Sequence, residues 1–345
     1  MESIIFRNCV WDNNRIYFFT AQDAIPIVLD LKRGEYSTLE IKNIEYYKKN
    51  PFDLISLLNK KIYALEMSGQ YMCEYSLETN EISYIKIDCN KRIDGNFALL
   101  TTESNQVFIF DRFAGLTIYG TQSKSVKKVS YPSSDCEIIT GCKYKDKYFL
   151  FPKEGNKVFQ YDISSEKWTT INLTEKWCDL IHVAVDEEHI LLLLEDGTII
   201  KWDTKKDISI INDIKEWYQS DRAVSRICIT NDSYIILPSL AEEILIFDKK
   251  THEIKAMSDY PKDFKYVNNN WAKYYGYCET EDSYIFACRK SDYILKIDKR
   301  DDGFEWINSS IESELLIRYK FANKIPVVEK KGYLQYLLKC NFSNS

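Results

Sequence analysis

The sequence has few of the residues on which several kinds of site depend. Its 345 residues include only 11 glycines, 7 prolines and 3 histidines. It has no glycine-rich phosphate loop and no G-x-S-x-G nucleophile motif, which disfavours a nucleotide site and a serine-based mechanism of those kinds. The histidines lack the H-x-H or H-E-x-x-H spacing of a zinc site. We therefore expect no catalytic residues, no metal and no cofactor.

Three other features that the sequence lacks bear on where the protein is located and on what it binds. The ten cysteines are scattered without a C-x-x-C pair, and the N-terminus has no basic, apolar leader, so we expect a cytoplasmic protein with reduced thiols. No apolar run approaches the roughly 18 residues of a membrane helix, so no membrane association is expected. The net charge of −6 lacks the basic excess of nucleic-acid-binding proteins, which makes nucleic acid an unlikely partner.

Aromatic residues are abundant, and they occur in a repeat. The 25 tyrosines and 17 phenylalanines favour β-strands. Seven times a polar turn precedes a hydrophobic pair, at intervals of 41 to 50 residues. The pairs are Ile16-Tyr17, Ile62-Tyr63, Val107-Phe108, Tyr148-Phe149, Ile190-Leu191, Tyr234-Ile235 and Tyr284-Ile285. A period of this length is typical of propeller blades.

A second marker follows each pair by about 13 residues, just after an alternating apolar segment. Asp and Ser bond their own backbone in turns, and Gly takes a positive φ, so all three suit the start of a hairpin. The markers are Asp30, Ser76, Gly120, Asp162, Asp203, Asp248 and Asp298. Each unit therefore predicts four short strands, A to D, with tight turns between A and B and between C and D.

Four strands per unit predict an all-β propeller of four-stranded antiparallel blades. We expect seven blades over residues 1–310, followed by a C-terminal extension over 311–345. The extension has the spacing of a short capping helix at Leu334, Leu337 and Leu338, and an alternative is that it supplies three strands of an eighth blade. A pair of β-sandwiches or a β-helix fits seven regular units less well.

Two phrases resemble known repeats. Tyr161-Asp162 followed by Trp168 resembles the later half of a kelch repeat, and "IIKWDTKK" resembles the W-D end of a WD40 repeat. The double glycine of kelch and the G-H of WD40 are absent. The chain thus resembles a divergent kelch/WD40-like β-propeller, similar to bacterial propellers from AT-rich genomes, and this resemblance implies a repeat protein built of propeller blades.

Antiparallel blades separate the connections into two rims. The A–B and C–D turns are short and polar, and they share one rim. The B–C loops and D–A crossovers share the other, where the crossovers are long and aromatic. Aromatic and arginine residues on loops are the types enriched in binding sites. The candidate binding residues on this face are Tyr46, Tyr47, Arg112, Lys153, Trp177, Trp217, Tyr218, Tyr266, Trp271, Arg289 and Lys290.

These observations predict a non-catalytic scaffold that binds a protein or peptide partner through the second rim. For each crossover aromatic, the competing interpretation is packing over a blade seam. The alternative function is a small-ligand or glycan-binding or -processing enzyme with its site in the central funnel of the same face. It would draw on His182, which begins an A strand, and on the loop carboxylates Asp23, Asp111, Glu154 and Asp196.

Overall fold

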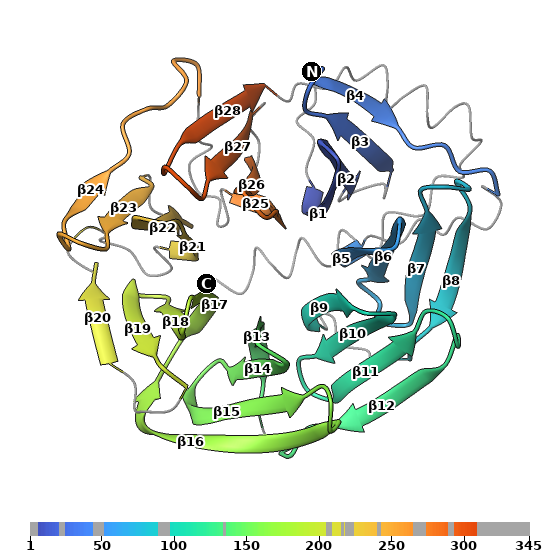
Figure 1. Ribbon diagram of the computed structural model, residues 1–345, viewed down its shortest axis with the longest axis horizontal. Coiled ribbons are helices and arrows are strands. Elements are labelled where there is room, and N and C mark those ends of the chain that lie inside the picture. The colour runs from blue at the N-terminus through green and yellow to red at the C-terminus, as the bar shows by residue number, and fades with distance from the viewer. Residues whose placement is uncertain are drawn as a thin grey trace, which may run out of the picture.

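The computed structural model is a ring of seven four-stranded antiparallel sheets (Figure 1). It describes residues 6–20, 25–43, 52–88, 97–133, 136–204, 209–214, 217, 224–239, 243–264, 274–288 and 293–308. Each sheet contains four consecutive strands, and the chain passes around the ring blade by blade. The predicted all-β, seven-bladed propeller is confirmed. The C-terminal extension, whether helix or part of an eighth blade, lies outside the described residues.

The strands of each blade are numbered from the axis outward. Blades 1 to 4 contain β1 (Phe6–Asp12), β2 (Arg15–Thr20), β3 (Pro26–Asp30), β4 (Glu35–Thr38); β5 (Phe52–Leu58), β6 (Lys61–Glu66), β7 (Tyr71–Ser76), β8 (Ile82–Lys86); β9 (Phe97–Glu103), β10 (Gln106–Asp111), β11 (Gly115–Gly120), β12 (Val126–Ser130); and β13 (Ile138–Tyr144), β14 (Lys147–Pro152), β15 (Gly155–Asp162), β16 (Lys167–Trp177).

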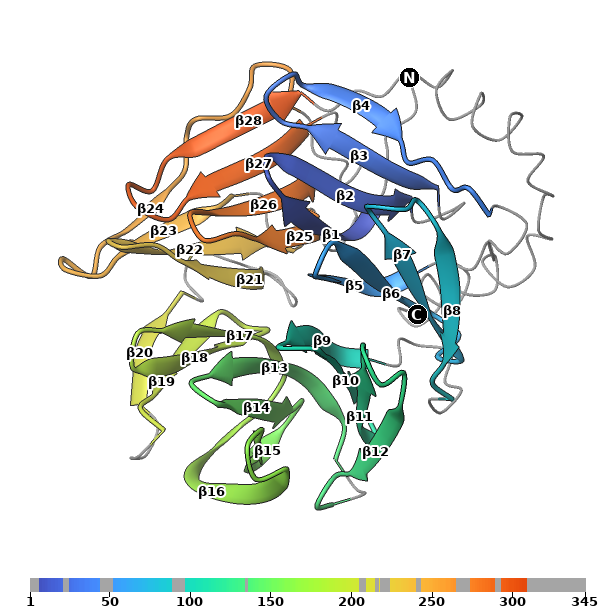
Figure 2. The same cartoon turned by 45° about the vertical axis from the view of Figure 1, so that its right-hand side comes forward.

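Blades 5 to 7 contain β17 (Leu180–Asp186), β18 (His189–Leu194), β19 (Thr198–Trp202), β20 (Ser209–Asp213); β21 (Val224–Ile229), β22 (Ser233–Pro238), β23 (Leu245–Asp248), β24 (Ile254–Ala256); and β25 (Tyr274–Glu279), β26 (Ser283–Cys288), β27 (Tyr293–Asp298), β28 (Phe304–Asn308). Figure 2 shows blade 7 stepping from β25 near the axis to β28 at the outer edge.

The polar turns noted in the sequence form the hairpins. Asn13 and Asn14 both have positive φ, 49° and 65°, which matches the twist of a two-residue hairpin. The acidic markers close the C–D turns: Asp162 Oδ1 accepts the Ser165 N–H at 2.8 Å, and Asp248 Oδ1 accepts the Thr251 N–H at 2.8 Å. The hydrogen bonds from Ser165 and Ser164 lower the pKa of Asp162 to about 2. A short carboxylate at this position therefore fixes the turn.

Burial differs sharply between neighbouring strands of one blade. The second strands are buried along nearly their whole length, and β22 and β26 are buried at every position. The innermost strands β5 and β9 bury their first residue and leave the next six partly exposed. The second strand is sandwiched between two neighbouring blades, whereas the innermost strand also faces the axis. Solvent therefore reaches the axial side of the innermost strands.

The core consists of seven clusters, one at each seam between neighbouring blades. At the seam of blades 4 and 5, Phe151 packs on Trp202 with ring centroids 6.2 Å apart. At the seam of blades 7 and 1, Cys9 and Cys278 are buried together with Ile16 and Ile285. Within the described strands no sheet is shared between blades 7 and 1, so side-chain packing closes the ring.

The described residues contain no helix that is long and apolar enough to cross a membrane.

Candidate functional site

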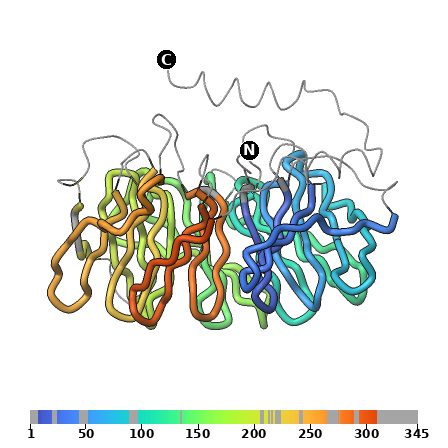
Figure 3. The backbone as a smooth tube through the Cα atoms, turned by 90° about the horizontal axis from the view of Figure 1, so that it is seen from above, coloured from blue at the N-terminus to red at the C-terminus, as the bar shows by residue number. Residues whose placement is uncertain are grey.

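The antiparallel order places the connections of each blade on two rims, as expected. We call the rim with the A–B and C–D turns the tight-turn rim, and the rim with the B–C loops and D–A crossovers the crossover rim. Figure 3 shows the short hairpins of the tight-turn rim along its lower edge.

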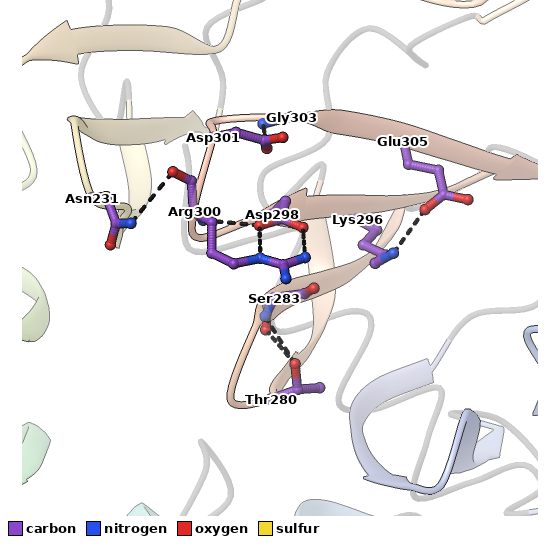
Figure 4. Close-up of polar contacts among 9 residues, drawn as sticks. All are labelled: Asn231, Thr280, Ser283, Lys296, Asp298, Arg300, Asp301, Gly303 and Glu305. Atoms are coloured by element: carbon purple, nitrogen blue, oxygen red, sulfur yellow. Dashed lines mark hydrogen bonds and ion pairs between the residues drawn. The ribbon is translucent and has the colours of Figure 1, made fainter.

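The tight-turn rim satisfies its charges internally, as blade 7 illustrates (Figure 4). Arg300 donates from Nε and Nη2 to the two carboxylate oxygens of Asp298, at 3.1 and 2.7 Å. Asn231 of the preceding blade donates to the Arg300 carbonyl at 3.4 Å. Lys296 pairs with Glu305 at 2.8 Å on the neighbouring strand. These groups bind one another and present few open donors to a partner.

Ion pairs also join one blade to the next on this rim. Lys143 of blade 4 pairs with Glu103 of blade 3 at 2.8 Å. Lys249 of blade 6 pairs with Asp186 of blade 5 at 3.0 Å and lies 4.9 Å from the centre of the Tyr234 ring. Because both members of each pair lie on the rim itself, the pairs hold neighbouring blades in register.

Two of the predicted charged residues on the crossover rim are paired. Arg112 forms an ion pair with Glu137, a residue of the following crossover, and its side chain is half-buried. Lys153 lies 3.2 Å from Asp179, and about half of each side chain is exposed. An exposed pair of this kind contributes little to stability, about 0–1 kcal/mol. Arg112 therefore tethers a loop, and Lys153 remains accessible.

The two predicted tryptophans among the described residues lie in different environments. Trp177 is 3% exposed, packs on Phe151 and donates from Nε1 to the Pro152 carbonyl at 3.0 Å. The prediction of Trp177 as a crossover residue is wrong, because strand β16 continues to Trp177, which pairs with Gly155. Trp217 is 45% exposed, one of the few large apolar side chains on the surface of the described residues. Of the two, Trp217 is the one that a partner can contact.

Seven other candidates lie outside the described residues, so their placement stays a prediction. They are Tyr46, Tyr47, Tyr218, Tyr266, Trp271, Arg289 and Lys290.

Other crossover aromatics pack onto the blades. Tyr131 is 8% exposed and its hydroxyl donates to the Asp111 carbonyl. Phe264 lies against Trp306 of blade 7, with ring centroids 4.6 Å apart, and Tyr260 stacks on Phe264. For these positions the competing interpretation from the sequence, packing over a seam, is the one that the structure shows.

The loop carboxylates among the described residues do not form a paired acid site. Asp111 Oδ1 accepts the N–H groups of Phe113 and Ala114, at 2.7 and 2.8 Å, and Asp196 Oδ1 accepts the Thr198 N–H at 2.9 Å. They cap their own turns. Glu154 is exposed, and Asp23 lies outside the described residues.

Polar side chains do come together on the innermost strands of blades 5, 6 and 7. His182 of β17 lies with Nε2 at 3.1 Å from Nη1 of Arg226 on β21. The guanidinium carbon of Arg226 lies 3.9 Å from the centre of the Tyr277 ring on β25. The Tyr277 hydroxyl donates to Glu279 at 2.6 Å, and Lys299 donates to the same carboxylate at 2.7 Å. We call His182, Arg226 and Tyr277 the axial cluster.

The protonation states of the axial cluster follow from burial and charge. Burial, followed by the positive charge of Arg226, holds the pKa of His182 well below its usual value, so the imidazole is neutral. A neutral imidazole has one acceptor nitrogen, and donors face both ring nitrogens of His182: Arg226 Nη1 lies 3.1 Å from Nε2, and the Ile227 N–H lies 3.5 Å from Nδ1. Burial also raises the pKa of Tyr277, with the Glu279 charge adding to the effect. Arg226 thus has two neutral neighbours.

The sequence pointed to His182 but not to Arg226 or Tyr277. The signal was present in the repeat, because His182 and Arg226 occupy equivalent places. Each follows a strand bulge and lies opposite a buried leucine of the second strand, Leu193 and Leu237 respectively. Aligning the A strands of neighbouring units would have placed the two residues side by side. Among the described residues no group of three or more His, Cys, Asp and Glu side chains is arranged to hold a metal ion.

No family model matches the chain, and no curated protein matches it. Solved structures do. A streptogramin B lyase aligns with a TM-score of 0.66 at 11% identity, over 89% of this chain and 95% of the lyase. A catalytically inactive virginiamycin B lyase from Staphylococcus aureus, with quinupristin, aligns with a TM-score of 0.64 at 12% identity, over 86% of this chain and 97% of the lyase.

A third likeness is to PorZ, a bacterial surface component of the type-IX secretion system of Porphyromonas gingivalis. The TM-score is 0.62 at 11% identity, over 90% of this chain and 39% of PorZ, so the chain spans well under half of that protein. At these identities the likenesses show the fold alone. The chain is a seven-bladed β-propeller with distant neighbours among bacterial propellers.

Proposed function

We propose that the protein is a non-catalytic scaffold that binds a peptide segment of a partner protein on its crossover rim. The supporting observation is the exposed tryptophan of the crossover rim, Trp217. On the tight-turn rim, lysines and arginines such as Lys249 and Arg300 bind acids of the same rim. The crossover rim exposes Trp217, and tryptophan is the residue type most enriched among binding hot spots.

A peptide selection tests this proposal. A displayed library of random peptides is selected on the purified protein, and the affinity of an enriched peptide is measured by calorimetry. Trp217→Ala is expected to weaken binding by roughly 30-fold, the effect of losing a hot spot of about 2 kcal/mol. The matched control is Val126→Ala, because Val126 is 40% exposed but follows a C–D turn on the other rim.

Two results would contradict the scaffold function. One is a selection that enriches no peptide. The other is an enriched peptide that binds Trp217→Ala and Val126→Ala with the affinity of the unmodified protein, since the crossover tryptophan would then have no part in binding.

A second candidate, a small-ligand receptor or enzyme with its site on the axis, is supported by the axial cluster. His182, Arg226 and Tyr277 come from the innermost strands of three neighbouring blades and contact one another. The described carboxylates Asp111 and Asp196 cap turns, which favours binding over two-acid glycan chemistry. A glycan array with the purified protein, and with Arg226→Gln as control, distinguishes this candidate from the scaffold.

The location and the repeat family remain proposals. We propose a cytoplasmic protein whose buried Cys73, Cys228 and Cys288 stay reduced. Fractionation of the source cells, with thiol labelling of the unfolded chain, tests both points. The kelch-like phrase has a physical basis in blade 4, since Tyr161 and Trp168 are cross-strand partners with ring centroids 4.9 Å apart. Membership of the kelch or WD40 group stays a prediction.

A further inference from the structure

Arg226 lies on the innermost strand of blade 6, β21. It contacts His182 on the preceding innermost strand and Tyr277 on the following one. A side chain that reaches residues of both neighbouring strands lies across the inner surface of the ring. Its position is the third residue of β21, close to the crossover rim where the innermost strands begin. The guanidinium is therefore near the same face that carries Trp217.

The charge of this region is not balanced among the described residues. Arg226 contacts a neutral imidazole and a neutral phenol, and no carboxylate in the part of the chain that the structure describes pairs with it. The nearest acid in the network, Glu279, is paired with Lys299 at 2.7 Å. Counting Arg226, Lys299 and Glu279, the network carries one positive charge in excess. A half-buried cation without a counter-ion is costly unless water or a ligand anion satisfies it.

The contacts of Arg226 also determine which part of its guanidinium group can bind a ligand. The guanidinium carbon lies over the Tyr277 ring, 3.9 Å from its centre, and Nη1 lies 3.1 Å from Nε2 of His182. Among the described residues the guanidinium has no other hydrogen bond, and an arginine edge binds a carboxylate with two parallel hydrogen bonds. A single cation with this geometry suits a planar monoanion. A phosphate site is usually built from several cationic or backbone donors.

We infer that Arg226, oriented by Tyr277 and His182, is a receptor for a carboxylate group that enters along the axis from the crossover rim. The carboxylate comes from the C-terminus of a peptide, from an Asp or Glu side chain of a peptide, or from a free organic acid. This inference rests on the proposed scaffold function and specifies the chemical group that the partner presents.

The chain offers a spectroscopic reporter, because it has three histidines and one of them belongs to the cluster. His189 begins β18 beside an A–B turn, and His252 lies in a C–D turn, so both are on the tight-turn rim. In the full chain labelled with 15N-histidine, three pairs of ring signals are followed by NMR at pH 7.5. A ligand at Arg226 perturbs the ring of His182, and the other two serve as internal controls.

Four probes separate the possible sources of the carboxylate. Sodium acetate supplies the bare group, with sodium chloride at equal ionic strength as the reference. Acetyl-Gly-Gly with a free C-terminus supplies a terminal carboxylate. Acetyl-Gly-Asp-Gly-amide supplies a side-chain carboxylate, and acetyl-Gly-Asn-Gly-amide is the uncharged match. We expect His182 alone to shift with acetate and with at least one charged peptide, and to stay unchanged with chloride and the Asn peptide.

Two variants at Arg226 complete the test. Arg226→Gln is expected to abolish the acetate response, and Arg226→Lys to weaken it by about tenfold, because an ammonium keeps the charge but loses the planar fork. Lys250→Gln removes an exposed cation from the tight-turn rim and should leave the response intact. If Arg226→Gln fails to fold, Arg226→Lys still reports, since it retains the charge.

A His182 signal that does not move with acetate, moves equally with chloride, or still responds in Arg226→Gln overturns the inference. That failure is separate from failure of the scaffold function. A selected peptide that depends on Trp217 while acetate has no effect removes only the carboxylate receptor. An acetate response without any selected peptide removes the peptide scaffold and leaves a receptor for small acids.

Discussion

The second strand and the innermost strand of a blade are neighbours, yet they hold different kinds of residue. In blade 5 the second strand β18 buries five consecutive apolar residues, Ile190 to Leu194. The adjacent β17 buries only Leu180 and Val183 and carries His182 among partly exposed residues. The difference arises because one strand is covered by two neighbouring blades and the other faces the axis. The buried apolar residues of the second strands therefore contribute most to stability. The innermost strands tolerate polar side chains that are partly exposed.

The largest expected effect is on stability, from truncating a second-strand residue. Phe151 on β14 is fully buried and packs on Trp177 and Trp202, so Phe151→Ala should lower the free energy of unfolding by about 3–5 kcal/mol. Leu99 on the innermost β9 is only half-buried, and Leu99→Ala should cost less, about 1–2 kcal/mol. Urea denaturation measures both. Equal losses would contradict the division between the two strands.

A smaller effect on stability is expected from the buried Trp177 and the exposed Trp217. Trp177→Phe keeps most of the buried ring but loses the hydrogen bond to the Pro152 carbonyl, so it should cost about 1–3 kcal/mol. Trp217→Phe on the exposed side chain should change stability by less than about 0.5 kcal/mol. Thermal unfolding of the two variants provides the measurement. A destabilised Trp217→Phe would show that this residue is also an anchor.

The smallest expected effect is a pH dependence that arises from His182. Its pKa in the folded state lies below the unfolded value of about 6.5, so the unfolded chain takes up the proton first as the pH falls. The folded state consequently loses stability as the pH drops below about 6.5. His182→Gln should flatten this part of the stability profile, as measured by urea unfolding between pH 7.5 and 5.

Arg226→Gln tests how much the charge of Arg226 contributes to the low pKa of His182. It removes the positive charge that helps to lower the pKa of His182, so the His182 pKa should rise in the NMR titration while burial still keeps it below the usual value. An unchanged pKa in Arg226→Gln would mean that burial alone controls this histidine.

Local patterns in the sequence were sufficient for the blades and for many of their turns. The spacing of the seven apolar pairs gave the blade number, because each pair lies in a buried second strand. Markers such as Asp162 and Asp248 gave the C–D turns, because an aspartate bonds backbone N–H groups two or three residues further along. Both depend on neighbours close in sequence, so they can be read without knowing the tertiary structure.

The candidate site depends on contacts between blades, which a single unit does not reveal. Trp177 and Trp217 look alike in the sequence, as aromatic residues in D–A crossovers. Only the position of Phe151 beneath one of them determines that Trp177 is an anchor while Trp217 stays exposed. Nothing in the A strand of its own unit distinguishes Arg226. Its contacts to His182 and Tyr277 form only when the ring places three blades side by side.

The sequence by itself determined that this chain forms seven units of four antiparallel strands, with short polar turns on one rim and long crossovers on the other. Periodicity and turn chemistry are local, and they are the same in every unit. The tertiary structure alone decided which aromatics are buried at the seams and which polar side chains meet on the axis. Closing the ring brings together residues about 45 positions apart, such as His182 and Arg226, and sets their burial and charge.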